Sequence, residues 1–136
     1  MKVYIITEGS YDAYHMIAVA STPENAELYK QAYEADEIEV WEVDPELDQV
    51  QAGRLFYRVV LSRNGRRLSA YLERPDLAAG YWLFTGSHIP ILHVRCFAET
   101  KAEAVEIAQA VREKLMDTGQ WPEERTTCDQ GIHPLV

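Results

Sequence analysis

The dipeptide Asn64-Gly65 constrains the fold of this chain more than any other feature, because it lies between two alternating apolar segments. Asn-Gly is the strongest two-residue signal for a β-hairpin and favours a type I′ turn. Leu55–Ser62 and Arg67–Glu73 are therefore predicted to be antiparallel strands. Folding about the turn places three apolar pairs on one face: Tyr57 with Leu72, Val59 with Ala70, and Leu61 with Leu68.

The N-terminal third predicts a strand, a second strand, a helix and a third strand. Lys2–Thr7 is apolar on both faces, which favours a central strand, and Tyr14–Ala20 follows it as the second. Thr22-Pro23 is typical of a helix start, and this helix is expected to reach about Ala35. A helical crossover makes the second strand parallel to the third, Glu37–Val43, with the first strand between them and antiparallel to both.

The C-terminal part predicts one more strand and one more helix. Ile91–Ala98 alternates, with Cys96 on one face and His93 on the other. Thr100 and Glu103 form a capping box for a helix that ends near Asp117. The fold class expected is therefore α+β, with a mixed, mainly antiparallel sheet of about six strands and two helices packed on one face. Residues 1–136 are expected to form a single domain, with 119–136 as an irregular C-terminal tail docked through Trp121.

Overall charge excludes some classes of function. The 136 residues carry a formal net charge of −9, which argues against binding nucleic acid or an anionic membrane through the whole surface. Two cysteines are too few for a disulfide scaffold. Met1 is followed directly by a predicted strand, and no run reaches the roughly 18 apolar residues of a membrane helix. We expect a cytoplasmic protein without a cofactor.

Charge is divided unevenly along the chain. Residues 1–53 hold two lysines against twelve carboxylates, a net charge of −10. Residues 54–98 hold seven arginines against two carboxylates, a net charge of +5. One interpretation is that the basic hairpin packs beside the acidic segment and neutralises it. The other is that the acidic segment meets a partner that has a basic surface.

The strongest candidate for such a contact is the acidic segment 34–48, EADEIEVWEVDPELD. Repeated carboxylates on an extended strand approximate the spacing of phosphates, which suggests a nucleic-acid mimic. Alternatively, charge on an edge strand only blocks unwanted sheet pairing. The candidate partner-binding residues are Glu37, Glu39, Trp41, Glu42, Asp44, Glu46 and Asp48.

A second candidate surface is basic, and a third is aromatic. The basic surface is the hairpin, with Arg58, Arg63, Arg66, Arg67 and Tyr71. The aromatic run 81–84 and the face of the predicted strand that bears His93 and Arg95 suggest a small-ligand or metal-binding accessory domain. However, no standard metal-ligand spacing is present, and the possible nucleophilic site of Ser10, Asp12 and His15 lies in or beside a predicted turn that already accounts for the serine and the aspartate, while His15 begins a predicted strand. We therefore predict no metal site and no catalytic residues.

The segments MKVYIITEGSYDAY, STPENAELY and DEIEVWEVDP resemble the N-terminal third of small uncharacterised proteins common in phages and mobile bacterial elements. The resemblance implies no particular activity or site residues. Together with the charge, it suggests a non-enzymatic interaction protein that inhibits a host defence protein or a nucleic-acid-binding protein.

Overall fold

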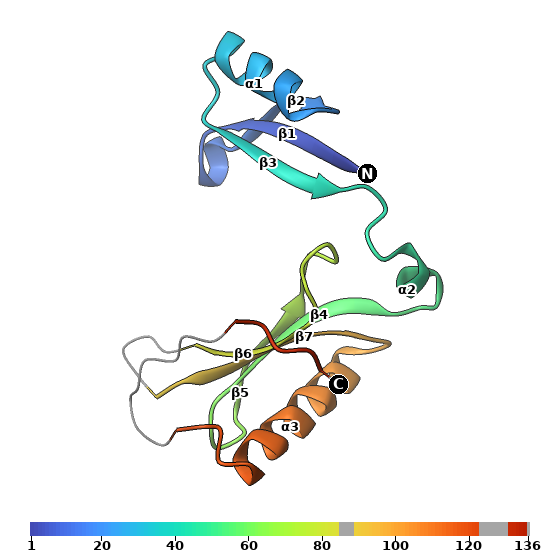
Figure 1. The fold of residues 1–136 in the computed structure, drawn as a ribbon, viewed down its shortest axis with the longest axis vertical. Coiled ribbons are helices and arrows are strands. Elements are labelled where there is room, and N and C mark those ends of the chain that lie inside the picture. Colours follow the sequence, from blue (N-terminus) through green and yellow to red (C-terminus); the bar gives the residue numbers. More distant parts are fainter. Residues whose placement is uncertain (85–88, 123–130, 136) are drawn as a thin grey trace. The chain divides into compact units, whose positions relative to one another are not determined.

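The computed structural model describes residues 1–84, 89–122 and 131–135, and within these ranges the chain forms seven strands and three α-helices (Figure 1). The chain divides into two compact units, Met1–Pro45 and Glu46–Val136. The strands are β1 (Lys2–Glu8), β2 (His15–Ala20), β3 (Glu37–Glu42), β4 (Leu55–Leu61), β5 (Arg67–Leu72), β6 (Gly80–Phe84) and β7 (Ile91–Ala98). The helices are α1 (Pro23–Ala32), α2 (Leu47–Gln51) and α3 (Lys101–Asp117), with a 3₁₀ turn at Tyr11–Ala13.

The first unit is a three-stranded sheet covered on one face by α1 (Figure 1). Its strand order is β2-β1-β3, and β1 is antiparallel to both neighbours, so that β2 and β3 are parallel. This confirms the predicted crossover and the central position of the first strand. The small core between sheet and helix is made of Ile6, Ala20, Ala26 and Ala35.

Helix α1 begins and ends where its backbone groups find partners. The Thr22 hydroxyl accepts a hydrogen bond from the amide of Asn25 at 3.2 Å, and Pro23 is the first helical residue. At the other end Glu34 is left-handed, with a φ of 50°, and the Ala35 amide donates to the Lys30 carbonyl. The helix therefore ends at Ala32, three residues before the predicted end.

The second unit is an antiparallel four-stranded sheet in the order β5-β4-β7-β6, with α3 on one face (Figure 1). Alternate residues of β4 and β7 face α3 and are almost fully buried. They meet two alanines of the helix, where small side chains let it approach the sheet. These facing residues are Val59, Leu61, Leu92, Val94 and Cys96 of the sheet, and Ala104 and Ala108 of α3.

The predicted hairpin forms, but its turn differs from the prediction. Tyr57 pairs with Leu72 and Val59 with Ala70 as expected, whereas Leu61 pairs with Arg67 rather than Leu68. In the turn, Gly65 has a φ of 88° while Asn64 does not have a positive φ, so this is not a type I′ turn. The Gly65 amide donates to the Ser62 carbonyl, which closes a longer loop and shifts the register by one residue.

Helix α3 has the predicted bounds, and its cap is a variant of the predicted capping box. The Thr100 hydroxyl accepts from the Glu103 amide at 3.1 Å, and the Glu103 carboxylate accepts from the amide of Glu99 at 3.0 Å. After the helix, Trp121 is 3% exposed and its indole Nε1 donates to the Pro90 carbonyl at 2.8 Å. The predicted docking of the tail through Trp121 is confirmed.

The prediction of about six strands is close to the seven observed, but the prediction of a single sheet is wrong. The strands are divided between two sheets, and the two longer helices each cover one face of a different sheet rather than sharing one. In one sheet β1 pairs with β2 and β3, in the other β4 pairs with β5 and β7, and among the described residues no strand pair joins the two sheets. The α+β class is confirmed, and the expectation of one domain over residues 1–136 stays a prediction.

Candidate functional site

The acidic strand β3 presents its side chains on two opposite sides. Ile38 packs against the core under α1, so residues that alternate with it, Glu37 and Glu39, lie on the other face of the sheet together with Trp41. We call this face of the β2-β1-β3 sheet, opposite α1, the acidic face. Its other members come from β1 and β2 and from the segment before β2: Val3, Ile5, Tyr14, Met16 and Val19.

Glu39 lies at the centre of the acidic face and is held by two neutral donors. Its Oε1 accepts from the Tyr14 hydroxyl at 2.9 Å, and its Oε2 accepts from the indole Nε1 of Trp41 at 3.1 Å. The hydrogen bond to Glu39 raises the pKa of the Tyr14 hydroxyl above its usual value. These donors fix the position of the carboxylate without cancelling its charge.

Apolar side chains surround these carboxylates. Tyr14, Met16 and Val19 are 48%, 57% and 54% exposed. Beside them a hollow of about 590 Å³ is lined by Gly9, Tyr14, Glu37 and neighbouring residues. The acidic face thus combines exposed apolar area with fixed negative charge.

The remaining candidate residues of the acidic segment lie elsewhere. Glu42 is on the α1 side of β3, with a carboxylate oxygen 3.4 Å from the N-terminal amino group of Met1. Asp44 and Glu46 flank Pro45 with φ of 51° and 53°, and Asp48 lies in α2 of the second unit. The structure therefore brings together Glu37, Glu39 and Trp41, and it does not form a continuous row from all seven.

The basic candidate surface is also divided. Arg66 and Arg67 are exposed at the hairpin tip, whereas the Arg63 Nε donates to the Trp121 carbonyl at 3.4 Å. Arg58 pairs across the strands with Tyr71, as predicted, and lies on the face of the sheet away from α3. Neutralisation of the acidic segment by this hairpin stays a prediction.

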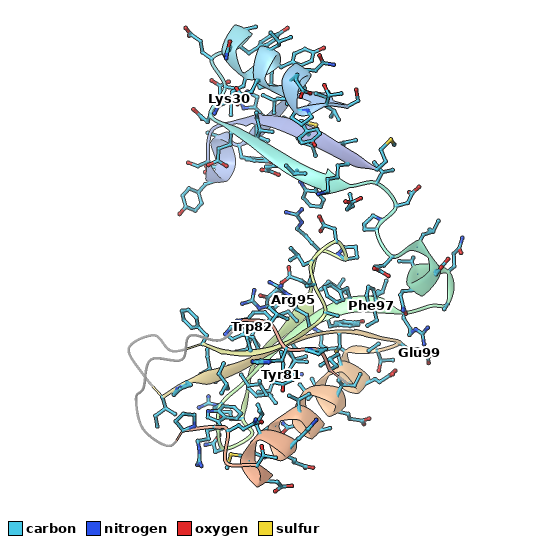
Figure 2. All side chains as sticks on the ribbon, viewed as in Figure 1. Lys30, Tyr81, Trp82, Arg95, Phe97 and Glu99 are labelled. Carbon is cyan, nitrogen blue, oxygen red and sulfur yellow. The ribbon has the colours of Figure 1, made fainter. Side chains whose placement is uncertain are left out.

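The face of the second sheet away from α3 carries a group of charged and aromatic side chains that contact one another. Figure 2 shows Trp82 and Arg95 on this side of the sheet, and Tyr81 on the α3 side. Strand alternation thus separates the aromatic run, which does not form one patch. We call the group formed by Arg58, Glu73, Trp82, His93 and Arg95 the Trp82 cluster.

The aromatic rings of the Trp82 cluster are in direct contact with its cations. Trp82 and His93 are cross-strand partners, and their rings stack with centroids 5.0 Å apart. The guanidinium carbons of Arg95 and Arg58 lie 4.6 Å and 5.1 Å from the centre of the indole ring. At these distances the indole stabilises both cations.

Glu73 supplies the negative charge of the cluster. Its Oε2 lies 3.5 Å from Arg58 Nη1 and also 3.5 Å from Arg95 Nε. The sequence singled out His93 and Arg95, but the roles of Arg58 and Glu73 here were missed. The only available signal was the predicted hairpin register, which places the Glu73 end of one strand beside the Arg58 region of the other.

His93 is held in its neutral form. Its Nδ1 accepts from the guanidinium of Arg58, at 2.8 Å from Nη2 and 3.2 Å from Nε, so the proton resides on Nε2. Burial, together with the positive charges of Arg58 and Arg95, lowers the pKa of His93 to about 4. Among the described residues, neither His93 Nε2 nor Arg95 Nε has a hydrogen-bond partner.

The described residues do not form a metal site, and the alternatives of a metal site and of a nucleophilic site concern His, Cys and Glu side chains at several places in the fold. No three His, Cys, Asp or Glu side chains there are placed to hold a metal ion. Cys96 lies on the α3 side of the sheet, opposite His93, and burial raises the pKa of its thiol to about 11. His88 and Cys128 fall outside the described residues. His15 Nε2 lies 3.3 Å from a Glu8 carboxylate oxygen, and both side chains are well exposed.

No protein-family model, curated protein or solved structure matches this chain. Within the described ranges, no helix is long and apolar enough to cross a lipid bilayer.

Proposed function

We propose that this chain is a non-enzymatic protein-interaction module that binds a basic partner through the acidic face. The observation that carries the proposal is the position of Glu37 and Glu39 beside exposed apolar side chains. The unit Met1–Pro45 holds two lysines against ten carboxylates, a net charge of −8. A unit with so few cations of its own attracts a partner of opposite charge.

The mixed character of the face supports a protein partner rather than a small ion. Protein interfaces combine an apolar centre with polar and charged groups around it. Met16 and Val19 offer apolar area, and the fixed Glu39 carboxylate offers an acceptor for a Lys or Arg side chain. The hollow lined by Tyr14 and Glu37 has room for one such side chain.

The resemblance to phage and mobile-element proteins extends this proposal to the inhibition of a host defence or nucleic-acid-binding protein. On β3 the basis for mimicry is a pair of acidic residues, Glu37 and Glu39, whose backbone positions are about 6.6–6.8 Å apart along one face of the strand. A basic site that normally meets phosphates is the partner surface that such a pair fits.

A comparison of two charge-reversed variants tests the proposal. Glu37→Lys with Glu39→Lys changes the acidic face, while Glu106→Lys with Glu113→Lys makes the same change in net charge at exposed positions of α3. Immobilised wild-type chain and the α3 variant are expected to retain the same partner from host lysate in a salt-sensitive manner. The β3 variant is expected to lose it. Equal retention by both variants would contradict the proposal.

A second candidate function is the binding of a small ligand at the Trp82 cluster. It is favoured by one specific observation: a buried imidazole and a guanidinium, on the same face of the sheet, each retain a donor without a hydrogen-bond partner among the described residues.

A further inference from the structure

The Trp82 cluster carries more positive than negative charge. Arg58 and Arg95 are both cationic, His93 is neutral, and Glu73 is the one carboxylate within ion-pair distance of the two guanidinium groups in the described part of the chain. The adjacent Arg74 does not alter this balance, because its side chain pairs with Asp76 at 2.7 Å. The cluster therefore has an excess of one positive charge in a largely buried position.

The cluster also has unused donors. The Arg58 guanidinium donates to His93 Nδ1, which leaves the imidazole proton on Nε2. This Nε2–H has no acceptor among the described residues, and His93 is only 8% exposed. Arg95 Nε lies 3.5 Å from Glu73, which permits charge attraction but makes no hydrogen bond. Buried donors without acceptors are uncommon, and each one destabilises the fold unless a bound group supplies the acceptor.

Two side chains at the cluster are partly exposed. The Arg58 side chain is 24% exposed, and Phe84, whose ring meets that of His93 edge-on, is 55% exposed. Trp82 provides an apolar wall beside the cations, and Phe84 provides one beside His93. A cluster with a purely structural role is expected to balance its charge and satisfy its donors, and this cluster does neither.

We propose that the Trp82 cluster is a binding site for an oxyanion, a carboxylate or phosphate group of a small ligand, held by Arg95 and by the Nε2–H of His93, while Arg58 adds positive charge from the Nδ1 side of the imidazole. An oxyanion supplies both the missing charge and the missing acceptors. This inference rests on the second candidate function and is independent of the acidic face. The aromatic walls favour a ligand in which the anionic group is attached to an apolar body.

The test is a titration of the full chain, labelled with ¹⁵N, followed through the imidazole resonances of His93. Sodium phosphate and sodium acetate are added at constant ionic strength and pH 7, with acetamide as the uncharged analogue of acetate. The expected result is a saturable shift of His93 with one or both anions and none with acetamide. Saturation by phosphate but not acetate assigns a phosphate group, and the reverse assigns a carboxylate.

Two variants connect the shift to the cluster. Arg95→Gln is expected to weaken anion binding at least tenfold, while Arg67→Gln, the same charge change at an exposed position of β5, leaves it unchanged. Glu73→Gln removes the competing carboxylate and is expected to tighten binding severalfold. This opposite effect keeps the test decisive if the Arg95 variant does not fold.

The possible outcomes separate this inference from the function on which it rests. Saturable binding of acetamide as strong as that of acetate would keep a small-ligand site but overturn its anionic class. Absence of any saturable shift would overturn both. An equal loss of binding in Arg67→Gln would show general charge attraction and would also overturn the inference.

Discussion

At the scale of single residues, His93 shows how its surroundings determine the state of a side chain. Strand alternation predicts that His93 and Cys96 lie on opposite faces of β7, and the structure confirms this. Alternation places Arg95 on the same face of β7 as His93, but it does not predict the contact with Arg58, which comes from β4, 35 positions earlier in the chain. The neutral imidazole is thus a product of tertiary packing.

This environment predicts a dependence of stability on pH. The pKa of His93 is about 4 in the folded chain and about 6.5 when unfolded, so between these values the unfolded state binds more protons. The free energy of unfolding is therefore expected to fall as the pH is lowered from about 6.5 to 4. The contribution of His93 is on the order of 3 kcal/mol.

Urea unfolding of the wild type and of His93→Gln at several pH values between 4 and 7 measures this effect. The difference between the two proteins removes the titration of the other groups. We expect the wild type to lose more stability than the variant on acidification. Parallel curves for the two proteins would show that His93 titrates normally in the fold.

At the scale of elements, local signals predict a helix or strand well where several of them agree. For α3, the Thr100 cap, the apolar period and Gly119 all indicate the same bounds, and the structure has them. For β6, the consecutive apolar residues Tyr81 to Phe84 carry no alternation, so their state could not be predicted. The pairing of β6 with β7 determines it instead.

The hairpin turn shows a local signal that was right about the element but wrong about its geometry. Asn64-Gly65 can form a type I′ turn, but also a longer loop in which only the glycine is left-handed. The carbonyl of Gly65 accepts from the Gln109 side chain at 2.9 Å, and Arg112 Nε donates to the Arg63 carbonyl at 2.8 Å. These contacts with α3 favour the longer loop, and sequence patterns do not contain them.

The contact with α3 predicts that Gly65 tolerates a side chain less well than Gly53. Both glycines have a positive φ, of 88° and 80°, so alanine at either position costs about 1 kcal/mol of backbone strain. A Cβ on Gly65 would also lie 3.2 Å from the Arg112 guanidinium, whereas one on Gly53 has nothing within 4 Å. Denaturant unfolding is expected to show a loss of about 1–2 kcal/mol for Gly65→Ala and a smaller loss for Gly53→Ala. Equal losses of stability in the two variants would mean that the Arg112 side chain moves aside without destabilising the fold.

At the scale of the whole molecule, the sequence predicted every strand except β6, but not the division of the strands between two sheets. Two apolar faces on β1 correctly indicate a central strand, and the same reasoning applies to β4, which is buried along most of its length. A chain with two central strands forms one large sheet or two small ones. The choice depends on pairing between distant strands, such as β4 with β7, which no local pattern encodes.

The two units differ greatly in the size of their cores, which leads to a prediction about their independent stability. The core of Met1–Pro45 consists of Ile6 and three alanines, whereas that of Glu46–Val136 contains twelve buried residues on both sides of the contact between α3 and its sheet. Burial of apolar area is the main source of stability, and a chain of about 40 residues seldom buries enough of it. The larger unit is therefore expected to fold when produced separately, and the smaller one is not.

Fragments 1–45 and 46–136 test this difference directly. Amide resonances of the fragment 46–136 are expected to overlay those of the same residues in the full chain over most of β4, β5, β7 and α3, with a cooperative thermal transition. The fragment 1–45 is expected to give the narrow amide dispersion of an unfolded chain, because the hydrogen bonds of three strands cannot offset the conformational entropy without a larger core. A fragment 46–136 that is unfolded would show that this sheet needs the N-terminal unit for its stability, despite having a separate core.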